Sequence, residues 1–246
     1  MKVAGITRIR NESEIIRSTL DHYADICKEG GIYVYDDAST DDTADICEAH
    51  PSVKVVIRNK EWDTNRTRAE YTTRQAVLER AQQDKPDWIL YFDADERIDW
   101  DDFPWAANFN NCDAVRMKLY DYYITPEDVR KDFWERQWLG PEFRRITMMF
   151  RNDEHLKYNR PDQRMATMRP NARILDAGSV KHYGKAISVD QWEETCDYYM
   201  THFPEPYKTK WAARKGKAIH TEMKSDFDRP LMKWNERTKK GVEIPA

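Results

Sequence analysis

The sequence predicts an α/β fold with a mostly parallel central sheet, flanking helices and a C-terminal helical extension. Apolar runs of strand length alternate with segments of helical periodicity over about the first 100 residues. Strand–helix–strand units form parallel pairs, because the helix carries the chain back across the sheet. The apolar run 88–92 ends abruptly in the acids of residues 93–96. This pattern is typical of a buried strand whose C-terminal end lies at a ligand-binding edge.

Each element of the first half has a local signal. Strands are expected at residues 3–6, 32–35, 53–57 and 88–92, where short apolar runs are bounded by polar segments. Helices are expected at residues 15–26, 39–47 and 65–83, where apolar residues recur at helical spacing. Asn11 or Ser13 is the expected N-cap of the first helix, and Gly30 with Gly31 should end it.

The second half is less regular. Strands are expected at residues 114–119, 144–151 and 173–175, and an amphipathic helix at 189–203. Residues 120–138 are rich in aromatics and charge and fit either a mobile loop or a solvated helical insertion. We expect one large domain over 1–203. The basic tail, 204–246, favours a solvated helix face over contact with an anionic membrane surface or acceptor.

Composition narrows the function classes. The chain has 246 residues, of which 40% are hydrophobic and 34% charged, and its net charge of −4 gives no electrostatic footprint for nucleic acid. The sequence contains no apolar run of transmembrane length and no signal-peptide core near Met1, so a cytoplasmic protein is expected. The four cysteines form no Cys-x-x-Cys pair, which predicts buried, reduced thiols.

Two acid clusters follow predicted strands. Asp93-Ala94-Asp95 ends the 88–92 strand, and Asp36-Asp37 ends the 32–35 strand. Parallel strands place their C-terminal ends on one side of the sheet, so both clusters can face one crevice. Carboxylates there can hold Mg2+ or Mn2+ together with a diphosphate. The alternatives are surface acids at 93–95 and, at 36–37, an acid pair that only complements a helix dipole.

Three segments carry a family resemblance. Neither a GxGxxG loop nor a P-loop is present, which argues against dinucleotide enzymes and P-loop NTPases. Instead, residues 3–12, 35–43 and 93–96 resemble the nucleotide-binding half of family 2 glycosyltransferases of the GT-A fold. The resemblance implies donor contacts in order along the chain: Thr7, Arg8 and Glu12 at the nucleotide, Asp36 or Asp37 at the base, Trp62 and Arg74 over the donor, and Asp93 with Ala94 near the ribose. Arg66 is a further expected phosphate or sugar contact, because guanidinium matches phosphate geometry.

The same resemblance implies a metal site. Asp95 is the first expected ligand of Mn2+ or Mg2+. His182 is the second, because similar enzymes carry a histidine after the last sheet strand that faces the diphosphate. Imidazole is an acceptable ligand for manganese. The alternative is that His182 serves only as a structural hydrogen-bonding residue.

The catalytic base is expected after the fifth or sixth strand, where inverting members of the family carry an acid. Asp162 is the candidate in that region, with Glu154 as the second. Each could equally be a surface acid paired with Arg160 or Arg164, and without an acid in line the enzyme would be retaining. The acid-pair and Gln-x-x-Arg-Trp patterns of processive polymer synthases do not occur in the sequence, which favours transfer of a single sugar.

Together these observations predict a metal-dependent, inverting glycosyltransferase. The resemblance implies a GT-A catalytic domain over 1–203, with a nucleotide-sugar half (1–98) and an acceptor half (99–203). If residues 120–138 form a mobile loop, it is expected on the acceptor side. Its expected partners are a nucleotide-diphosphate sugar donor, UDP-linked in the favoured case, and a glycan or other hydroxyl acceptor, with no nucleic acid. A sugar nucleotidyltransferase is the first alternative, but it would want a Gly-rich loop in place of residues 7–13. The others are a non-catalytic carbohydrate- or nucleotide-binding protein and a metal-dependent nuclease, which would need a two-metal acid cluster.

Overall fold

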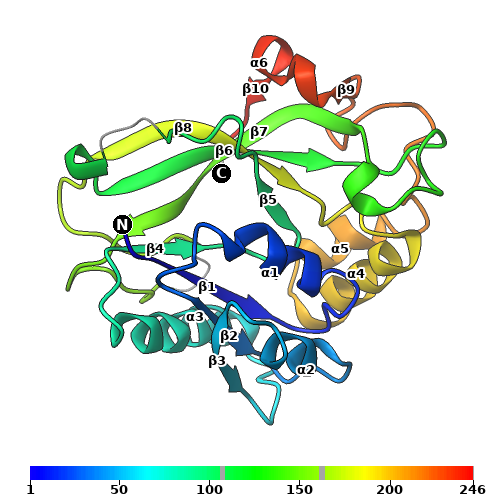
Figure 1. Cartoon of the computed structure of the whole chain (residues 1–246). Coiled ribbons are helices and arrows are strands. Elements are labelled where there is room, and N and C mark those ends of the chain that lie inside the picture. Colours follow the sequence, from blue (N-terminus) through cyan, green and yellow to red (C-terminus); the bar gives the residue numbers. More distant parts are fainter. Residues whose placement is uncertain (106–108, 161–163, 246) are drawn as a thin grey trace. The chain divides into compact units, whose positions relative to one another are not determined.

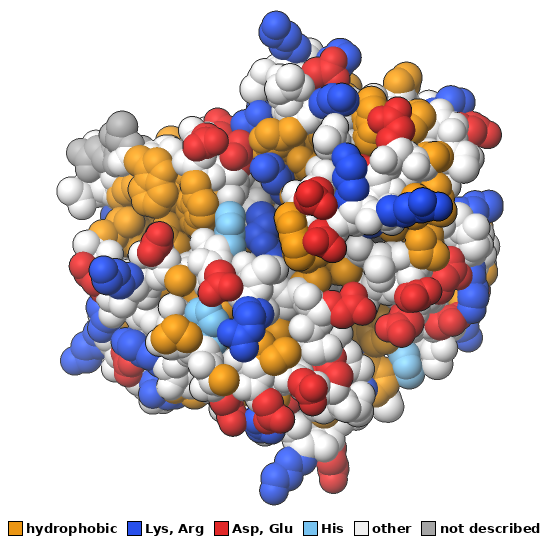
Figure 2. Space-filling model, turned by 45° about the vertical axis from the view of Figure 1, so that its right-hand side comes forward, with side chains coloured by type: hydrophobic (Ala, Val, Ile, Leu, Met, Phe, Trp, Pro, Cys, Tyr) orange, Lys and Arg blue, Asp and Glu red, His pale blue; other side chains and the backbone are white. Residues whose placement is uncertain are grey.

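The structure is a computed structural model that describes residues 1–105, 109–160 and 164–245. The chain divides into two compact units, which are treated separately below. Unit 1 consists of Met1–Ala94, Pro104–Met117 and Thr147–Ala177. Unit 2 consists of Asp95–Phe103, Lys118–Ile146 and Gly178–Ala246. On the face shown in Figure 2, acidic and basic side chains are interspersed, as the nearly balanced composition leads one to expect.

Unit 1 contains the predicted parallel sheet (Figure 1). Strands β1 (Val3–Ile9), β2 (Ile32–Asp36), β3 (Val53–Arg58) and β4 (Trp88–Tyr91) lie in the order β3-β2-β1-β4, and all three pairings are parallel. Helices α1 (Ile16–Ala24), α2 (Thr43–Glu48) and α3 (Arg66–Gln82) connect them, and α3 packs on β1 and β2. The succession of strands and helices predicted for this half is therefore confirmed.

Strand β4 is buried throughout, as its unbroken apolar run predicts. It pairs with β1 on one edge and, antiparallel, with the end of β7 (Trp138–Arg151) on the other. Tyr91 belongs to a core cluster with Tyr33 and Phe150, while Phe92 stacks on Tyr23 of α1 with ring centroids 4.0 Å apart. Each such fully buried side chain stabilises the fold by roughly 1.5–3 kcal/mol.

Two local predictions in this unit are wrong. Strand β1 runs on to Ile9, because Arg8 and Ile9 still pair with β2. The N-cap of α1 is Ile15, and no side-chain cap bond is found there among the described residues. Asn11 instead accepts a hydrogen bond from the Thr40 backbone, so its side chain joins two loops rather than starting the helix.

Unit 2 is built on mainly antiparallel pairs. Strand β5 (Glu96–Ile98) pairs with the end of β8 (Ile174–His182), and β9 (Met232–Lys233) and β10 (Val242–Glu243) pair with β7. Strand β6 (Ala114–Tyr122) lies between β7 and β8, and all three strands contribute residues to both units. Helices α4 (Val189–His202), α5 (Tyr207–Ala212) and α6 (Arg237–Lys240) complete it, and short 3-10 turns span Phe109–Asn111, Phe133–Glu135 and Trp234–Glu236.

The predicted second-half strands exist but are longer than predicted. Strand β8 extends to His182, because Val180, Lys181 and His182 pair with β5. Residues 120–138 contain the end of β6 and a 3-10 turn, and no α-helix lies within this described segment. The fold class is confirmed, including the C-terminal helices. All four cysteines are buried and free, and no helix among the described residues is long and apolar enough to span a membrane.

Candidate active site

The acid pair at the end of β2 is buried in unit 1. The backbone of Asp37 donates to the Ile9 carbonyl oxygen at 2.9 Å, which fixes the acid where β1 and β2 end together. Its Oδ2 lies 2.9 Å from Nη2 of Arg66 and 3.5 Å from Nε of Arg8. Asp36 accepts from the Ser39 backbone and so closes the following loop. Neither acid lies in the first turn of α2, whose acidic residue is Asp45.

A buried chain of contacts runs from Asp37 to Asp93 within unit 1. Arg8, which faces Asp37, is 2.6 Å from Oε1 of Glu70, and Oε2 of Glu70 is 2.9 Å from Nη1 of Arg74. Arg74 donates to the hydroxyl oxygen of Tyr91 at 2.9 Å, and Tyr91 donates to Asp93 at 2.6 Å. Asp37 and Asp93, one acid from each predicted cluster, are thus joined by ion pairs and, through the neutral phenol of Tyr91, by hydrogen bonds.

Glu70 is the centre of this chain, and the sequence analysis missed it. Burial alone would raise the pKa of Glu70, but Arg8 and Arg74 lower it below its usual value. A third arginine, Arg66, lies 3.6 Å from the same carboxylate. The signal was present in the sequence, because Arg66, Glu70 and Arg74 are spaced four residues apart on one helix face.

Asp93 is a carboxylate held by arginines. Its Oδ2 lies 3.6 Å from Nε of Arg164. Burial would raise the pKa of Asp93, but Arg164 and Arg74 hold it below its usual value. Burial raises the pKa of Tyr91 well above its usual value, so the phenol stays protonated and can donate to Asp93. Arg164 was considered only as a partner of surface acids.

The other expected donor residues lie on the same strand ends and loops of unit 1. Two guanidinium groups lie over the ring of Trp62, with Cζ of Arg10 at 4.6 Å and Cζ of Arg66 at 4.9 Å from its centroid. Thr7 is fully buried, and its hydroxyl has no hydrogen-bond partner in the described part of the chain. The Glu12 backbone donates to Thr43, and the Ala94 carbonyl accepts from the hydroxyl of Thr19 on α1.

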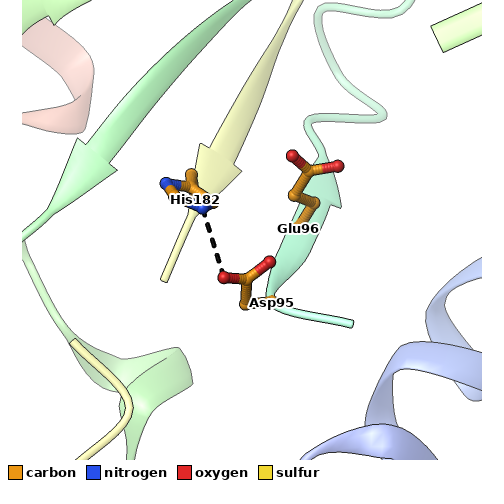
Figure 3. Close-up of side chains that lie close together, drawn as sticks. All are labelled: Asp95, Glu96 and His182. Atoms are coloured by element: carbon orange, nitrogen blue, oxygen red, sulfur yellow. Dashed lines mark ion pairs between the residues drawn. The ribbon is translucent and has the colours of Figure 1, made fainter. Parts of the chain in front are cut away.

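The expected metal ligands come together in unit 2. One ligand atom each of Asp95, Glu96 and His182 lies within 4.8 Å of the other two. Figure 3 shows Asp95 and Glu96 at the start of β5 and His182 at the end of β8, with the ion pair between Asp95 and His182 drawn as a dashed line. Nε2 of His182 is 3.2 Å from Oδ2 of Asp95, and Glu96 is the cross-strand partner of His182. Glu96 was not predicted as a ligand, although it continues the acid run.

A second carboxylate orients the histidine. Nδ1 of His182 lies 2.6 Å from Oδ1 of Asp121 on β6. Burial would lower the pKa of His182, but Asp95 and Asp121 raise it to about 10, so the ring is an imidazolium between two acids. Burial would also raise the pKa of Asp121, whereas Lys185 and His182 hold it well below its usual value.

These residues fit a divalent cation. Two carboxylates and an imidazole are a donor set for Mn2+ or Mg2+ completed by phosphate oxygens, and atoms this close can share one ion. The imidazolium supplies positive charge beside Asp95, and a metal there would replace its Nε2 proton. Asp121 would then hold the Nδ1 proton, which is the usual support of a metal-bound histidine. Gly184 leaves room for the Asp95 carboxylate, because a Cβ at this position would displace Oδ2 of Asp95.

Only one of the two expected bases, Glu154, lies within the described residues. Glu154 is exposed in the loop after β7. Its neighbour Asp153 accepts from the His155 backbone. Asp162 lies outside the described residues.

Comparison with known proteins decides the family. Residues 6–169 match the model of Glycosyl transferase family 2, which is most of the chain and includes both acid clusters. The chain belongs to this family. The predicted family, the predicted GT-A fold class and the predicted enzyme class, a glycosyltransferase, are therefore confirmed.

More specific relatives are distant. An uncharacterized protein of Mycobacterium tuberculosis is 35% identical over 103 residues, which is 41% of this chain and 25% of that protein. The chain therefore matches only a quarter of the length of this curated relative. Residues 1–349 of TarS from S. aureus are 16% identical, with 86% of this chain and 68% of that chain covered and a TM-score of 0.43. The mannosyltransferase PcManGT of Pyrobaculum calidifontis, solved with GDP-Man and Mn2+, is 17% identical, with 87% and 68% covered and a TM-score of 0.43.

Proposed function

We propose that this glycosyltransferase is metal-dependent and moves a single sugar from a nucleotide-diphosphate sugar, UDP-linked in the favoured case, to an acceptor hydroxyl. The observation that carries the proposal is the chemistry around Asp93-Ala94-Asp95 in a member of family 2. Asp93 lies among arginines, and Asp95 is grouped with Glu96 and His182. A metal–diphosphate needs hard or imidazole ligands for the ion and cations for the phosphates, and this chain has both.

The contacts support a role for each donor residue. Asp37, fixed by Arg8 and Arg66, is proposed to accept a hydrogen bond from the nucleobase, with Asp36 shaping the loop beside it. Asp93, to which Tyr91 donates, is proposed to accept from a ribose hydroxyl. The remaining proposed donor contacts are Thr7, Glu12, Trp62, Arg74 and the backbone of Ala94.

The metal ligands are proposed to be Asp95 and His182, with Glu96 as a third. When bound, the divalent cation neutralises the charge that develops on the diphosphate as its bond to the sugar breaks. Asp121 keeps Nε2 of His182 directed at Asp95 by binding Nδ1. Glu96, with no exposed surface, is the buried member of the set.

Inversion needs a base. The acceptor hydroxyl oxygen bonds to the anomeric carbon, its proton passes to a carboxylate, and the nucleoside diphosphate leaves. We propose Asp162 as this carboxylate and Glu154 as the second candidate, on the sequence argument alone.

The test is a thermal-shift panel of UDP, GDP, CDP and dTDP with and without Mn2+. A ligand that binds only the native state raises the melting temperature. We expect one nucleotide, UDP in the favoured case, to raise it only with Mn2+, and Asp95→Ala to abolish that shift. Asp101→Ala, which removes an exposed carboxylate of the same segment, should leave the shift unchanged. No shift with any nucleotide in the wild type would refute the donor site.

Product analysis separates the alternatives. A transferase releases a nucleoside diphosphate from the sugar donor, and slow transfer to water gives the same product without an acceptor. A sugar nucleotidyltransferase would instead make pyrophosphate from a nucleoside triphosphate and a sugar phosphate. A non-catalytic binding protein would show the thermal shift but no metal-dependent turnover.

A further inference from the structure

The C-terminal tail, residues 204–246, contacts the strand of the proposed metal ligands. Nε1 of Trp234 donates to Oδ2 of Asp99 at 3.0 Å, and Nη2 of Arg237 lies 2.9 Å from the same oxygen. Asp99 directly follows β5, which begins at Glu96 and has only three residues. Among the described residues, β5 pairs with β8 alone and is the last strand in the sheet order. Few backbone bonds fix this strand, so the two contacts from the tail add substantially to them.

Trp234 is itself packed against the neighbouring strands of unit 2. Its ring centroid lies 5.7 Å from that of Tyr120 and 6.0 Å from that of Tyr122, both on β6. Nζ of Lys181 on β8 is 5.0 Å from the same ring. Because the indole is packed in this way on β6 and β8, its hydrogen bond fixes where Asp99 and the end of β5 lie.

A second part of the tail reaches the histidine of the proposed ion site. Oδ2 of Asp226 is 2.8 Å from Nζ of Lys185, and Lys185 is 2.9 Å from Oδ2 of Asp121. Asp121 is the carboxylate that binds Nδ1 of His182. Arg214 fixes Asp226 in turn, with Nη2 at 2.6 Å from Oδ2. The side chains of Asp226, Lys185 and Asp121 are largely buried, so salt screens these ion pairs little.

The tail is anchored to the sheet by further contacts that do not involve the ion site. Its strands β9 and β10 pair with β7, and the hydroxyl of Ser225 donates to Oε1 of the buried Glu142 on β7 at 2.9 Å. A segment fixed in this way can hold other groups in place, because its own position does not depend on them.

We propose that the C-terminal tail positions both halves of the ion site, so that Trp234 and Asp226 are positioning residues for its ligands. This inference rests on the proposed function, because it takes the three residues grouped around Asp95 as the ligands. A metal is bound tightly only when other contacts hold its ligands close to the coordination geometry. Trp234 acts on the strand of the two acids, and Asp226 acts on the histidine.

The first experiment measures the affinity of the full chain for Mn2+ by electron paramagnetic resonance. Asp226→Asn should weaken binding by roughly five- to tenfold, less than the loss for a group that touches a ligand directly, because Lys185 and Asp121 stand between it and the histidine. Asp228→Asn, the same change on an exposed side chain of the same loop, should bind Mn2+ like the wild type. Equal affinities of Asp226→Asn and the wild type would overturn the role of Asp226.

Trp234 is tested by a second pair of variants. Trp234→Phe keeps a ring against β6 but removes the hydrogen bond to Asp99, and it should weaken Mn2+ binding by roughly three- to tenfold. Trp134→Phe, at an exposed tryptophan of unit 2, should leave it unchanged. Urea denaturation in EDTA separates positioning from packing. A contact that only supports the fold would lower the free energy of unfolding without changing the Mn2+ affinity of the folded protein, and that result would overturn the role of Trp234.

A third experiment needs no variant of the tail. Coupling between two sites is reciprocal, so bound Mn2+ should slow amide hydrogen exchange in residues 223–243 by a factor similar to the affinity lost in the tail variants. Exchange in α2 of unit 1 should not change, and Asp95→Ala should abolish the slowing. Mn2+ binding without slower exchange in the tail would overturn the proposal. No Mn2+ binding by the wild type would instead refute the proposed ion site and, with it, the role of the tail.

Discussion

The carboxylates of units 1 and 2 are neutralised in different ways. Asp37 and Asp93 in unit 1 face arginines, which stay charged at every accessible pH. Asp95 in unit 2 faces a histidine, which can give up its proton. The first arrangement is a fixed scaffold of charge, whereas the second holds a positive charge that another cation can replace. The arginine-bound acids therefore keep the same charged neighbours at every accessible pH. Beside Asp95, by contrast, a cation could take the place of the proton on His182.

The largest expected effect is a loss of stability when the arginine–carboxylate network of unit 1 is broken. Glu70→Gln removes the carboxylate shared by Arg8, Arg66 and Arg74. Removing this shared carboxylate from three buried guanidinium groups should lower the free energy of unfolding by about 3 kcal/mol. Urea denaturation measures this. Glu79→Gln, an exposed acid on the same helix, should change it by less than about 0.5 kcal/mol, and equal effects of the two variants would contradict the central role of Glu70.

The next effect concerns metal binding at the Asp95 cluster of unit 2. Asp121→Asn keeps the size of the side chain but removes the charge that holds Nδ1 of His182. Mn2+ affinity should fall by about 10–100-fold, as for other carboxylates that support a metal-bound histidine. Free Mn2+ measured by electron paramagnetic resonance reports this. An unchanged affinity would mean that Asp121 acts only through its ion pairs with Lys185 and Arg144.

The pH dependence of stability tests the difference between the histidine of unit 2 and the arginines of unit 1. The pKa of His182 is raised to about 10, above its unfolded value of about 6.5. Its ion pairs therefore contribute fully below pH ~6.5, and their contribution is lost as pH rises through ~10. In EDTA, the free energy of unfolding should fall between pH 7 and 10 by roughly 3–4 kcal/mol more in the wild type than in His182→Gln. If the free energy of unfolding depended on pH in the same way in both proteins, the raised pKa of His182 would be contradicted.

The smallest effect tests the stacking in unit 1. Trp62→Leu removes the aromatic ring that Arg10 and Arg66 contact through their guanidinium groups. A partly exposed cation–π contact contributes about 0.5–1 kcal/mol, so the loss of stability should be of that size. Trp62→Phe should recover part of it in the same denaturation assay. A loss several times larger would mean that Trp62 also supports packing of the loop.

The sequence predicted those features that depend on neighbours along the chain. The buried strand before Asp93 was legible because its apolar run and the following acids are adjacent. Asp95 and His182 were paired through the family resemblance, and the structure places them in contact. Their functional roles stay predictions.

The features that escaped prediction depend on partners far apart in sequence. Asp121 and His182 are 61 residues apart, and nothing local marks Asp121 as special. Arg164 was seen only beside its sequence neighbours, although it lies with Asp93. The length of strand β8 was underestimated. Its last residues hydrogen-bond through the backbone to β5, so this part of the strand carries no apolar run that the sequence could show.

Gly184 has a consequence for reading related sequences. Its hydrogen atom occupies space that any other side chain would take from the Asp95 carboxylate. A relative that keeps both acids of the 93–95 motif but carries a larger residue at this position would have to move the carboxylate that corresponds to Asp95. We therefore expect the proposed ion site to be altered in such a relative, even though its acid motif is intact.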